Sequence, residues 1–217
     1  GVSEGERFFV RDVADYVADV DAMVEFARSR EDGRPLFLLG HSAGGVISST
    51  YCLQYQHKLS GFICESFAFK VYAPDAALTL VKWIAGVAPH FGALKLKNRD
   101  FSRDPALVQA MDDDPLIRGE TQPAQTVAAL TRANERLKKE FGRITLPLMI
   151  LHGTDDKATD PRGSRMFHAT AGSVDKTLKL YDGHAHDLLN DVGREVVIGD
   201  IIDWLQVRAA APVRTAA

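Results

Sequence analysis

The feature that most constrains this chain is the sequence Gly-His-Ser-Ala-Gly-Gly at residues 40–45, which directly follows an apolar run. A helical pattern follows it at residues 46–56. Between a buried strand and a helix, Gly-x-Ser-x-Gly is typical of a nucleophile elbow, a sharp turn that pushes a serine hydroxyl out over the end of a sheet. Gly40 and Gly44 are expected to be glycines because strand and helix pass closely there. The sequence therefore predicts that Ser42 is a nucleophile in a strained backbone conformation.

Strand-like and helical segments alternate along much of the chain. Apolar strand-like runs occur at residues 35–39, 59–65, 146–153 and 177–181, and helical patterns at 7–30, 46–56, 161–171 and 195–207. Asp160 and Pro161 suit the N-cap and first turn of the third helix. In the last helix, the residues expected to face inward are Val196, Val197, Ile201, Trp204 and Leu205. This alternation predicts a mainly parallel α/β sheet with helices on both faces.

The segment 66–140 interrupts this alternation. Its pattern is mostly helical, with interruptions at Pro74, Pro89, Pro105, Pro115 and Pro123. We interpret it as a helical cap inserted between two strands of the sheet. The chain then divides into a first part of the core at 1–65, the cap at 66–140, a second part of the core at 141–208 and a flexible tail at 209–217.

A serine nucleophile needs a base to remove its proton and an acid to orient that base. Asp155 and Asp156 both follow the strand at 146–153, and the layout Gly-x-x-Asp after a strand favours Asp156 as the acid. His184 and His186 both follow the last strand on a loop, as the base must. On this reasoning either histidine is a candidate.

Composition and charge exclude several other classes of protein. The formal net charge of −3 argues against a nucleic-acid binder, which would carry a basic stripe. Cys52 and Cys64 are expected to be buried free thiols, which favours a reducing, cytoplasmic location. No apolar run is long enough to span a membrane. No histidines share a metal-ligand spacing backed by cysteine or carboxylate, so we expect no metal site.

With these sites in place, the chain resembles the monoglyceride lipase-like branch of the α/β-hydrolases, which includes serine aminopeptidase and lysophospholipase types. The segments that carry the resemblance are residues 1–5, the elbow at 40–45, the cap residues 102–105 and 114–116, the acid loop 151–156 and the base loop 176–186. In this family the catalytic histidine is the third residue after the glycine of the base loop, which places it on His186. The resemblance thus implies an α/β-hydrolase fold and a triad of Ser42, Asp156 and His186.

The resemblance also implies a reaction. It predicts hydrolysis of acyl esters such as monoacylglycerols or lysophospholipids, with the backbone N–H of Ala43 in the oxyanion hole and without a cofactor. The same triad would serve an acyltransferase, an amidase or aminopeptidase, or a C–C hydrolase. A non-catalytic binding protein on this fold is a further alternative. The oligomeric state stays open.

Two groups of side chains in or near the cap are candidates for substrate contact. The expected acyl pocket is lined by His41, Leu80, Trp83 and Ile84, although plain packing would explain each of them equally well. Basic residues that could meet anionic head groups, in a transient contact with a lipid interface, are Lys95, Lys97, Arg99 and Arg103. A solvated loop is the alternative reading of this basic group.

The chain departs from the family pattern at its start. Family members have about four strands before the elbow strand, whereas Ser42 follows a single helix here. We therefore expect the N-terminal strands, and the loop that supplies the second oxyanion donor, to belong to a missing N-terminal portion of the same protein. Loss of one such donor costs about 10²–10³-fold in turnover, so the 217 residues alone are expected to be poorly active.

Overall fold

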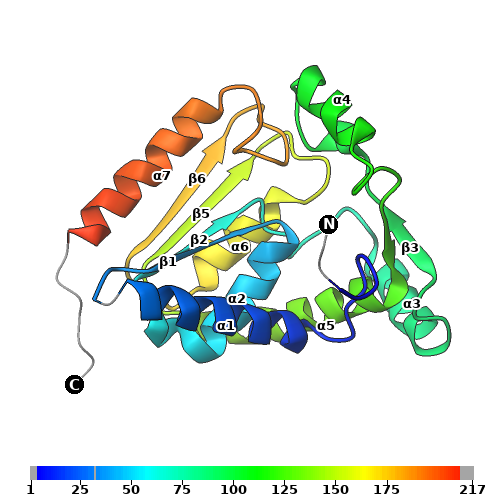
Figure 1. The fold of residues 1–217 in the computed structure, drawn as a ribbon, viewed down its shortest axis with the longest axis horizontal. Coiled ribbons are helices and arrows are strands. Elements are labelled where there is room, and N and C mark those ends of the chain that lie inside the picture. Colours follow the sequence, from blue (N-terminus) through cyan, green and yellow to red (C-terminus); the bar gives the residue numbers. More distant parts are fainter. Residues whose placement is uncertain (1–3, 32, 211–217) are drawn as a thin grey trace.

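Four parallel strands form the central sheet of the computed structural model, which describes residues 4–31 and 33–210 (Figure 1). In their order across the sheet the strands are β1 (Phe37–His41), β2 (Gly61–Glu65), β5 (Leu148–Gly153) and β6 (Lys176–Tyr181). This confirms the predicted parallel sheet. Residues 1–3, where the family resemblance begins, and 211–217, most of the predicted tail, lie outside the described residues.

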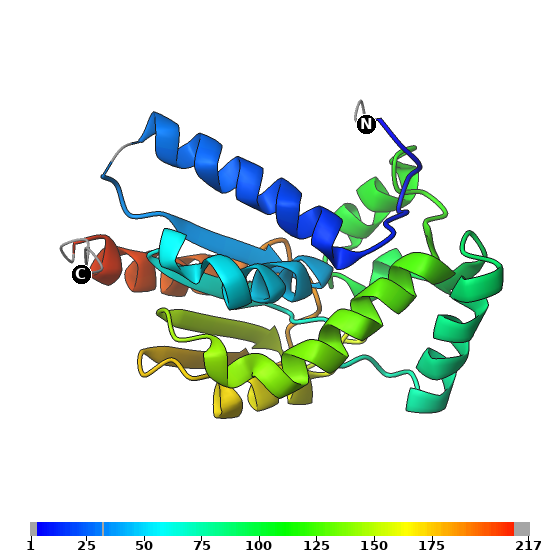
Figure 2. The ribbon, with the colours of Figure 1, turned by 90° about the horizontal axis from the view of Figure 1, so that it is seen from below.

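Helices cover both faces of this sheet (Figures 1 and 2). One face carries α1 (Val13–Arg30), α2 (Ala43–Tyr55), α5 (Ala124–Glu140) and α6 (Pro161–Thr170), and the other carries α7 (Arg194–Ala209). Short 3₁₀ turns follow α2 and α5 at Gln56–Lys58 and Phe141–Arg143. The arrangement is the two-sided layering expected when strands and helices alternate along a chain.

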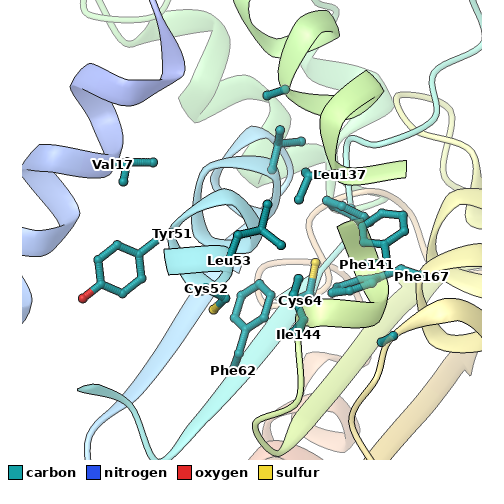
Figure 3. Packing of buried hydrophobic residues seen from close by; sticks show 14 of the residues in the cluster. Val17, Tyr51, Cys52, Leu53, Phe62, Cys64, Leu137, Phe141, Ile144 and Phe167 are labelled. Atoms are coloured by element: carbon teal, nitrogen blue, oxygen red, sulfur yellow. The ribbon is translucent and has the colours of Figure 1, made fainter. Parts of the chain in front are cut away.

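Strand β2 shows how the core is divided, because its successive side chains point to opposite faces of the sheet. Phe62 and Cys64 belong to the larger cluster on the α2 side, and Ile63 belongs to the smaller cluster under α7. In the larger cluster, the rings of Phe141 and Phe167 stack with centroids 4.6 Å apart (Figure 3). Fully burying one such side chain stabilises the fold by about 1.5–3 kcal/mol. Cys52 and Cys64 are buried free thiols, as predicted.

The first helix begins later than predicted. Its N-cap is Asp12, whose side chain accepts a hydrogen bond from the N–H of Ala14 at 2.8 Å. Upstream, Phe8 has a positive φ of 62°, which a helix does not allow. Val10 is nevertheless buried, and its N–H is bonded to the Thr126 hydroxyl at 3.0 Å. The helix was predicted to begin at residue 7 because Val10 continues the apolar pattern of α1, but the burial of Val10 comes from tertiary packing and not from helical periodicity.

The closing helix α7 corrects one further expectation. Val197, Ile201 and Trp204 are buried as predicted, but Val196 is 63% exposed. Val197, Ile201 and Trp204 recur at steps of four and three residues and share the face toward the sheet, whereas Val196 lies about 100° around the axis from Val197, outside that face.

The segment between β2 and β5 lies largely beyond the carboxyl ends of the strands, on the side to which their arrows point (Figure 1). Its elements are α3 (Asp75–Val87), β3 (Gly92–Lys95), a 3₁₀ turn (Asn98–Asp100), α4 (Pro105–Asp113) and β4 (Thr121–Pro123). The antiparallel pair of β3 and β4 was not expected in a segment read as mostly helical. Both strands are too short to show a period of two.

Helix α5 joins this segment to the core. Ala124 and Ala128 pack with Ala85 of α3 in a small cluster, whereas Ala133 and Leu137 belong to the main core. The predicted boundary between cap and core coincides with the end of this helix, and the division into domains stays a prediction.

Among the described residues, α1 is the sole helix or strand before β1, and β1 pairs with β2 alone. The elbow strand thus forms one edge of the four-stranded sheet. No helix in residues 4–31 and 33–210 has the length and apolar character needed to cross a bilayer.

Candidate active site

Ser42 occupies the turn between β1 and α2 in a backbone conformation that side-chain-bearing residues rarely adopt. Its φ is 54° and its ψ is −118°. The turn is held by the Ser42 N–H, which donates to the Glu65 carbonyl at 2.9 Å, and by the Ser42 carbonyl, which accepts from Gly45 N–H at 3.0 Å. Such strain persists where surrounding bonds fix it, and it is common at functional sites.

Glycine was expected at positions 40 and 44 to avoid a collision between strand and helix, and the structure requires it at only one of them. A Cβ on Gly40 would lie 2.5 Å from the Gly44 carbonyl oxygen, so glycine is required there. A Cβ on Gly45 would lie 3.0 Å from the Cys64 sulfur, which is also tight. At Gly44 a Cβ would meet nothing within 4 Å, so the expected collision at that position is wrong. The close approach runs from the α-carbon of Gly40 to the backbone of Gly44.

The structure brings Ser42, His186 and Asp156 together at the carboxyl ends of β1, β6 and β5. His186 Nε2 lies 2.9 Å from Ser42 Oγ, and His186 Nδ1 lies 2.7 Å from Asp156 Oδ2. Both His186 and Asp156 are buried. With Nδ1–H donating to the carboxylate, Nε2 is left to accept the serine proton.

The competing candidates lie elsewhere. Asp155 is exposed and forms an ion pair with Lys157, and its N–H donates to the His184 carbonyl at 3.0 Å. His184 closes the turn after β6 by donating its own N–H to the Tyr181 carbonyl. Asp160 caps α6, as predicted, by accepting from the N–H of Arg162. None of these residues is hydrogen-bonded to Ser42 or His186 in the described part of the chain.

A second histidine contacts the Asp156 carboxylate. His152 Nε2 lies 3.0 Å from Asp156 Oδ2, and its Nδ1 lies 2.7 Å from the Ser164 hydroxyl. The Thr159 hydroxyl donates to the same Oδ2 at 2.7 Å. Burial works to raise the pKa of Asp156, but hydrogen bonds from His152 and His186 outweigh it and the pKa is lowered. His152 was not identified from the sequence, although it is the penultimate residue of β5, the strand whose next loop carries Asp156.

The base loop, which in the structure runs from β6 to α7 over residues 182–193, is also hydrogen-bonded to the cap. Asp191, which is buried, accepts the N–H of Ala185 at 2.8 Å and the backbone and side chain of Arg103 at 2.7 and 2.8 Å. Phe101 places its ring edge-on to His186, with centroids 4.9 Å apart. Arg103, expected as one of a basic group near a lipid interface, is therefore engaged in an ion pair within the fold.

On the other side of His186 lies a second histidine–carboxylate pair, His41 with Glu65. His41 Nδ1 contacts Glu65 Oε2, and the rings of His41 and His186 lie 4.8 Å apart. Burial works to lower the pKa of His41, but the hydrogen bond and charge of Glu65, with the charges of Asp187 and Asp156, outweigh it and raise the pKa. Glu65 was not identified from the sequence, where it reads as the last residue of a buried strand.

His41 and Glu65 also belong to a group of side chains that could in principle hold a metal ion. In the part of the chain that the structure describes, His41, Glu65 and Asp187 form a group whose potential ligand atoms lie within 4.8 Å of one another. Both oxygens of Glu65 already have partners in the Leu188 N–H, the Ser66 hydroxyl and the His41 ring. We therefore assign this group to the protein's own hydrogen bonding.

Two of the three predicted pocket residues of the cap are exposed, and the third packs against α5. Leu80 and Trp83 are 58% and 72% exposed on α3, and Ile84 packs with Ala85 and its neighbours on α5. The structure places His41 beside His186, whereas an acyl-pocket role for the three cap residues stays a prediction.

Comparison with known proteins agrees with this fold. Residues 1–193 match the Hydrolase_4 family, described as serine aminopeptidase, S33, and the chain belongs to this family of α/β-hydrolases. It is 30% identical to the monoglyceride lipase of Mus musculus, covering 97% of this chain and 71% of that protein. It is 28% identical to the monoacylglycerol lipase of Mycolicibacterium smegmatis, covering 94% of this chain and 74% of that protein.

Solved structures show the same architecture. The monoacylglycerol lipase of Paleococcus ferrophilus superposes with a TM-score of 0.78 at 28% identity, covering 91% of this chain and 76% of that one. A soluble variant of the monoglyceride lipase of Saccharomyces cerevisiae superposes with a TM-score of 0.82, covering 97% and 75%. At 22% identity this second likeness concerns the fold alone.

Proposed function

We propose that this protein hydrolyses carboxylic esters of the monoacylglycerol type through an acyl-enzyme formed on Ser42. The observation that carries the proposal is the continuous hydrogen-bonded chain from Ser42 through His186 to Asp156. A strained, partly buried serine with a base at 2.9 Å and a buried acid behind that base has the geometry of an activated nucleophile.

In the first half of the reaction, Ser42 Oγ attacks the acyl carbonyl while His186 Nε2 takes the serine proton. Asp156 holds the imidazole in the tautomer with Nδ1–H and stabilises the imidazolium that forms. His186 then delivers the proton to the leaving alcohol oxygen, and the ester C–O bond breaks. The products of this half are an acylated Ser42 and a free alcohol.

Charge develops on the carbonyl oxygen as the serine attacks, and the backbone N–H of Ala43 would stabilise it. Ala43 is the first residue of α2, and the first N–H groups of a helix have no intrahelical acceptor. The helix dipole adds a partial positive charge at the same place. In the second half, His186 activates a water molecule that releases the acid and restores Ser42.

The substrate class rests on relatives and on the cap. Relatives that cover nearly the whole chain are monoglyceride lipases, so a single acyl chain on a small alcohol is the first substrate to test. Apolar side chains exposed on α3, which would favour a transient contact with a lipid surface, are Leu80, Trp83 and Val87.

A substrate panel tests the proposal with the full-length protein. We expect release of fatty acid from monoacylglycerols, slower release from lysophospholipids and little cleavage of aminoacyl amides, with all activity lost in Ser42→Ala. Preferential cleavage of amides, or acyl transfer to an added alcohol in place of hydrolysis, would replace the proposal with another reaction on the same triad. Activity that persists in Ser42→Ala would contradict it.

A further inference from the structure

Glu65 is a buried carboxylate that the proposed mechanism does not use. It is the last residue of β2 and its side chain is fully buried. Removing an ionised carboxylate from water is costly unless hydrogen bonds and opposite charge compensate. The positions of its partners therefore indicate what this carboxylate does.

Apart from the adjacent Ser66, those partners come from two segments, the loop after β6 and the elbow. Glu65 Oε1 accepts the N–H of Leu188 at 2.9 Å and the hydroxyl of Ser66 at 3.0 Å, while Oε2 contacts His41 Nδ1. The main-chain carbonyl of Glu65 accepts the N–H of Ser42. Leu188 is two residues after His186, and His41 is one residue before Ser42, so Glu65 bonds to both the base loop and the elbow.

The rings of His41 and Phe101 both lie close to the ring of His186. His41, held by Glu65, has its ring 4.8 Å from that of His186. Phe101, whose carbonyl accepts the Asp187 N–H at 2.7 Å, stands edge-on to the same ring. A shift of the base loop relative to the elbow would alter the distance between His186 Nε2 and Ser42 Oγ.

We propose that Glu65 is a positioning residue that fixes the base loop against the elbow and so sets the distance from His186 to Ser42. The inference rests on the proposed function, because it concerns the same serine and histidine. A carboxylate suits this role because its two oxygens are acceptors only, one for the Leu188 N–H and one for the Nδ1–H of His41. A displacement of about 1 Å between reacting groups can cost about 10²-fold in rate.

The titration of His41 gives a readout that does not depend on turnover. The ionisable groups that face His41 are Glu65, Asp187, Asp156 and His186. Because Glu65 helps to raise the pKa of His41, the pair contributes stability at acidic pH, and this contribution is lost as the pH rises through the folded-state value. Replacing Glu65 by glutamine should therefore lower the midpoint of His41 in an NMR titration.

The decisive experiment compares Glu65→Gln and Glu65→Ala with wild type in the full-length protein. Titration of active sites with a fluorophosphonate gives kcat per competent enzyme, so that misfolded protein does not count. Glutamine can still accept from Leu188 but carries no charge, so kcat should fall about tenfold, and alanine should cost about 100-fold. KM should change by about twofold or less, because neither variant alters a substrate contact.

A matched control is Asp160→Asn. Asp160 is also a buried carboxylate near the carboxyl edge of the sheet, but it caps α6 and does not contact the base loop. Its kcat per active site should equal that of wild type. Should Glu65→Ala fail to fold, Glu65→Gln alone decides through kcat and the His41 midpoint.

Two outcomes separate this inference from the proposed function. Wild-type kcat per active site in Glu65→Gln, with an unchanged His41 midpoint, would overturn the positioning role while leaving the serine hydrolase intact. A wild-type protein that neither reacts with the fluorophosphonate nor cleaves esters would overturn the proposed function, and the positioning role with it.

Discussion

The base loop and cap helix α3 belong to the same active-site end of the molecule, yet they are held in opposite ways. Around His186, backbone and ring atoms are bonded to three buried carboxylates, from Asp156, Asp191 and Glu65. Helix α3 instead packs through a small cluster centred on Ala85 and exposes three of its six large apolar side chains, Leu80, Trp83 and Val87. The loop around His186 is thus fixed by directional bonds, whereas helix α3 is held mainly by packing of small apolar side chains.

The energetic contrast follows from the side chains in each place. Alanine side chains bury little apolar area, so the α3 contact with α5 stabilises the fold far less than the stacked phenylalanines of the core. Hydrogen bonds to charged groups contribute about 1.5–3 kcal/mol each, more than neutral ones. Substitutions near His186 should therefore have large and specific effects, and substitutions on the outside of α3 should have small ones.

The largest effect is expected at the nucleophile itself. Ser42→Ala should lower kcat for monoacylglycerol hydrolysis by about 10⁴–10⁶-fold, because no other group can form the acyl-enzyme. The midpoint of thermal unfolding should not fall, since alanine removes one hydroxyl at a partly exposed position. A loss of less than about 100-fold, measured on purified protein, would show that another residue carries the reaction.

The second-largest loss of activity is expected at Asp156, the acid that orients His186. Asp156→Asn should lower kcat by about 10⁴-fold, because the amide favours the wrong tautomer of His186. The variant also replaces an acceptor shared with His152 by a group that can donate, so its unfolding midpoint should fall as well. Asp155→Asn is the matched control. If the two variants lose activity equally, the assignment of Asp156 as the acid is contradicted.

A smaller effect should follow from cutting the link between cap and base loop. Arg103→Met keeps much of the side-chain bulk but removes the ion pair with buried Asp191, which should cost about 1–3 kcal/mol of unfolding free energy. Urea denaturation measures the loss directly. An unfolding free energy within about 0.5 kcal/mol of wild type would mean that the cap is not fastened to the base loop by this pair.

The smallest effect is expected on the outer face of α3, where the chain offers a matched pair. Val87 on α3 and Val207 on α7 are each 72% exposed. Val87→Ser should slow hydrolysis of micellar monoacylglycerol about twofold to fivefold without changing the rate on a soluble short-chain ester, because it removes apolar area from the lipid-facing surface. Val207→Ser should change neither rate, and equal effects of the two variants would remove the case for a lipid contact at α3.

Much of the catalytic edge could be predicted because its signals are local. The elbow combines a strand, a glycine-framed serine and a helix within about twenty residues, and the order of acid and base along the chain follows from the fold. The role of Asp160 as a helix N-cap could also be predicted, because Pro161 and a helical pattern follow it directly.

The roles of Glu65 and His152 could not be predicted in the same way. Glu65 reads as part of a buried strand, and what distinguishes it is a partner brought close only by folding, Leu188, 123 residues away. His152 also reads as part of a buried strand, and its contact with Asp156, four residues further on, depends on how the loop after β5 folds back. The start of α1 was wrong for a related reason, because Val10 is buried in the core without being helical, and its N–H is bonded to Thr126, 116 residues away. Contacts between residues far apart in the chain produce no periodic pattern in the sequence, so they could not be predicted from it.

The central claim, that Ser42 is a nucleophile activated by His186, is tested most directly by fluorophosphonate labelling of the full-length protein followed by mass spectrometry of its peptides. We expect one phosphonate adduct, on the peptide that contains Ser42, absent in Ser42→Ala and formed at least about 100-fold more slowly in His186→Gln. An adduct on a different residue, or labelling of His186→Gln at the wild-type rate, would contradict the claim.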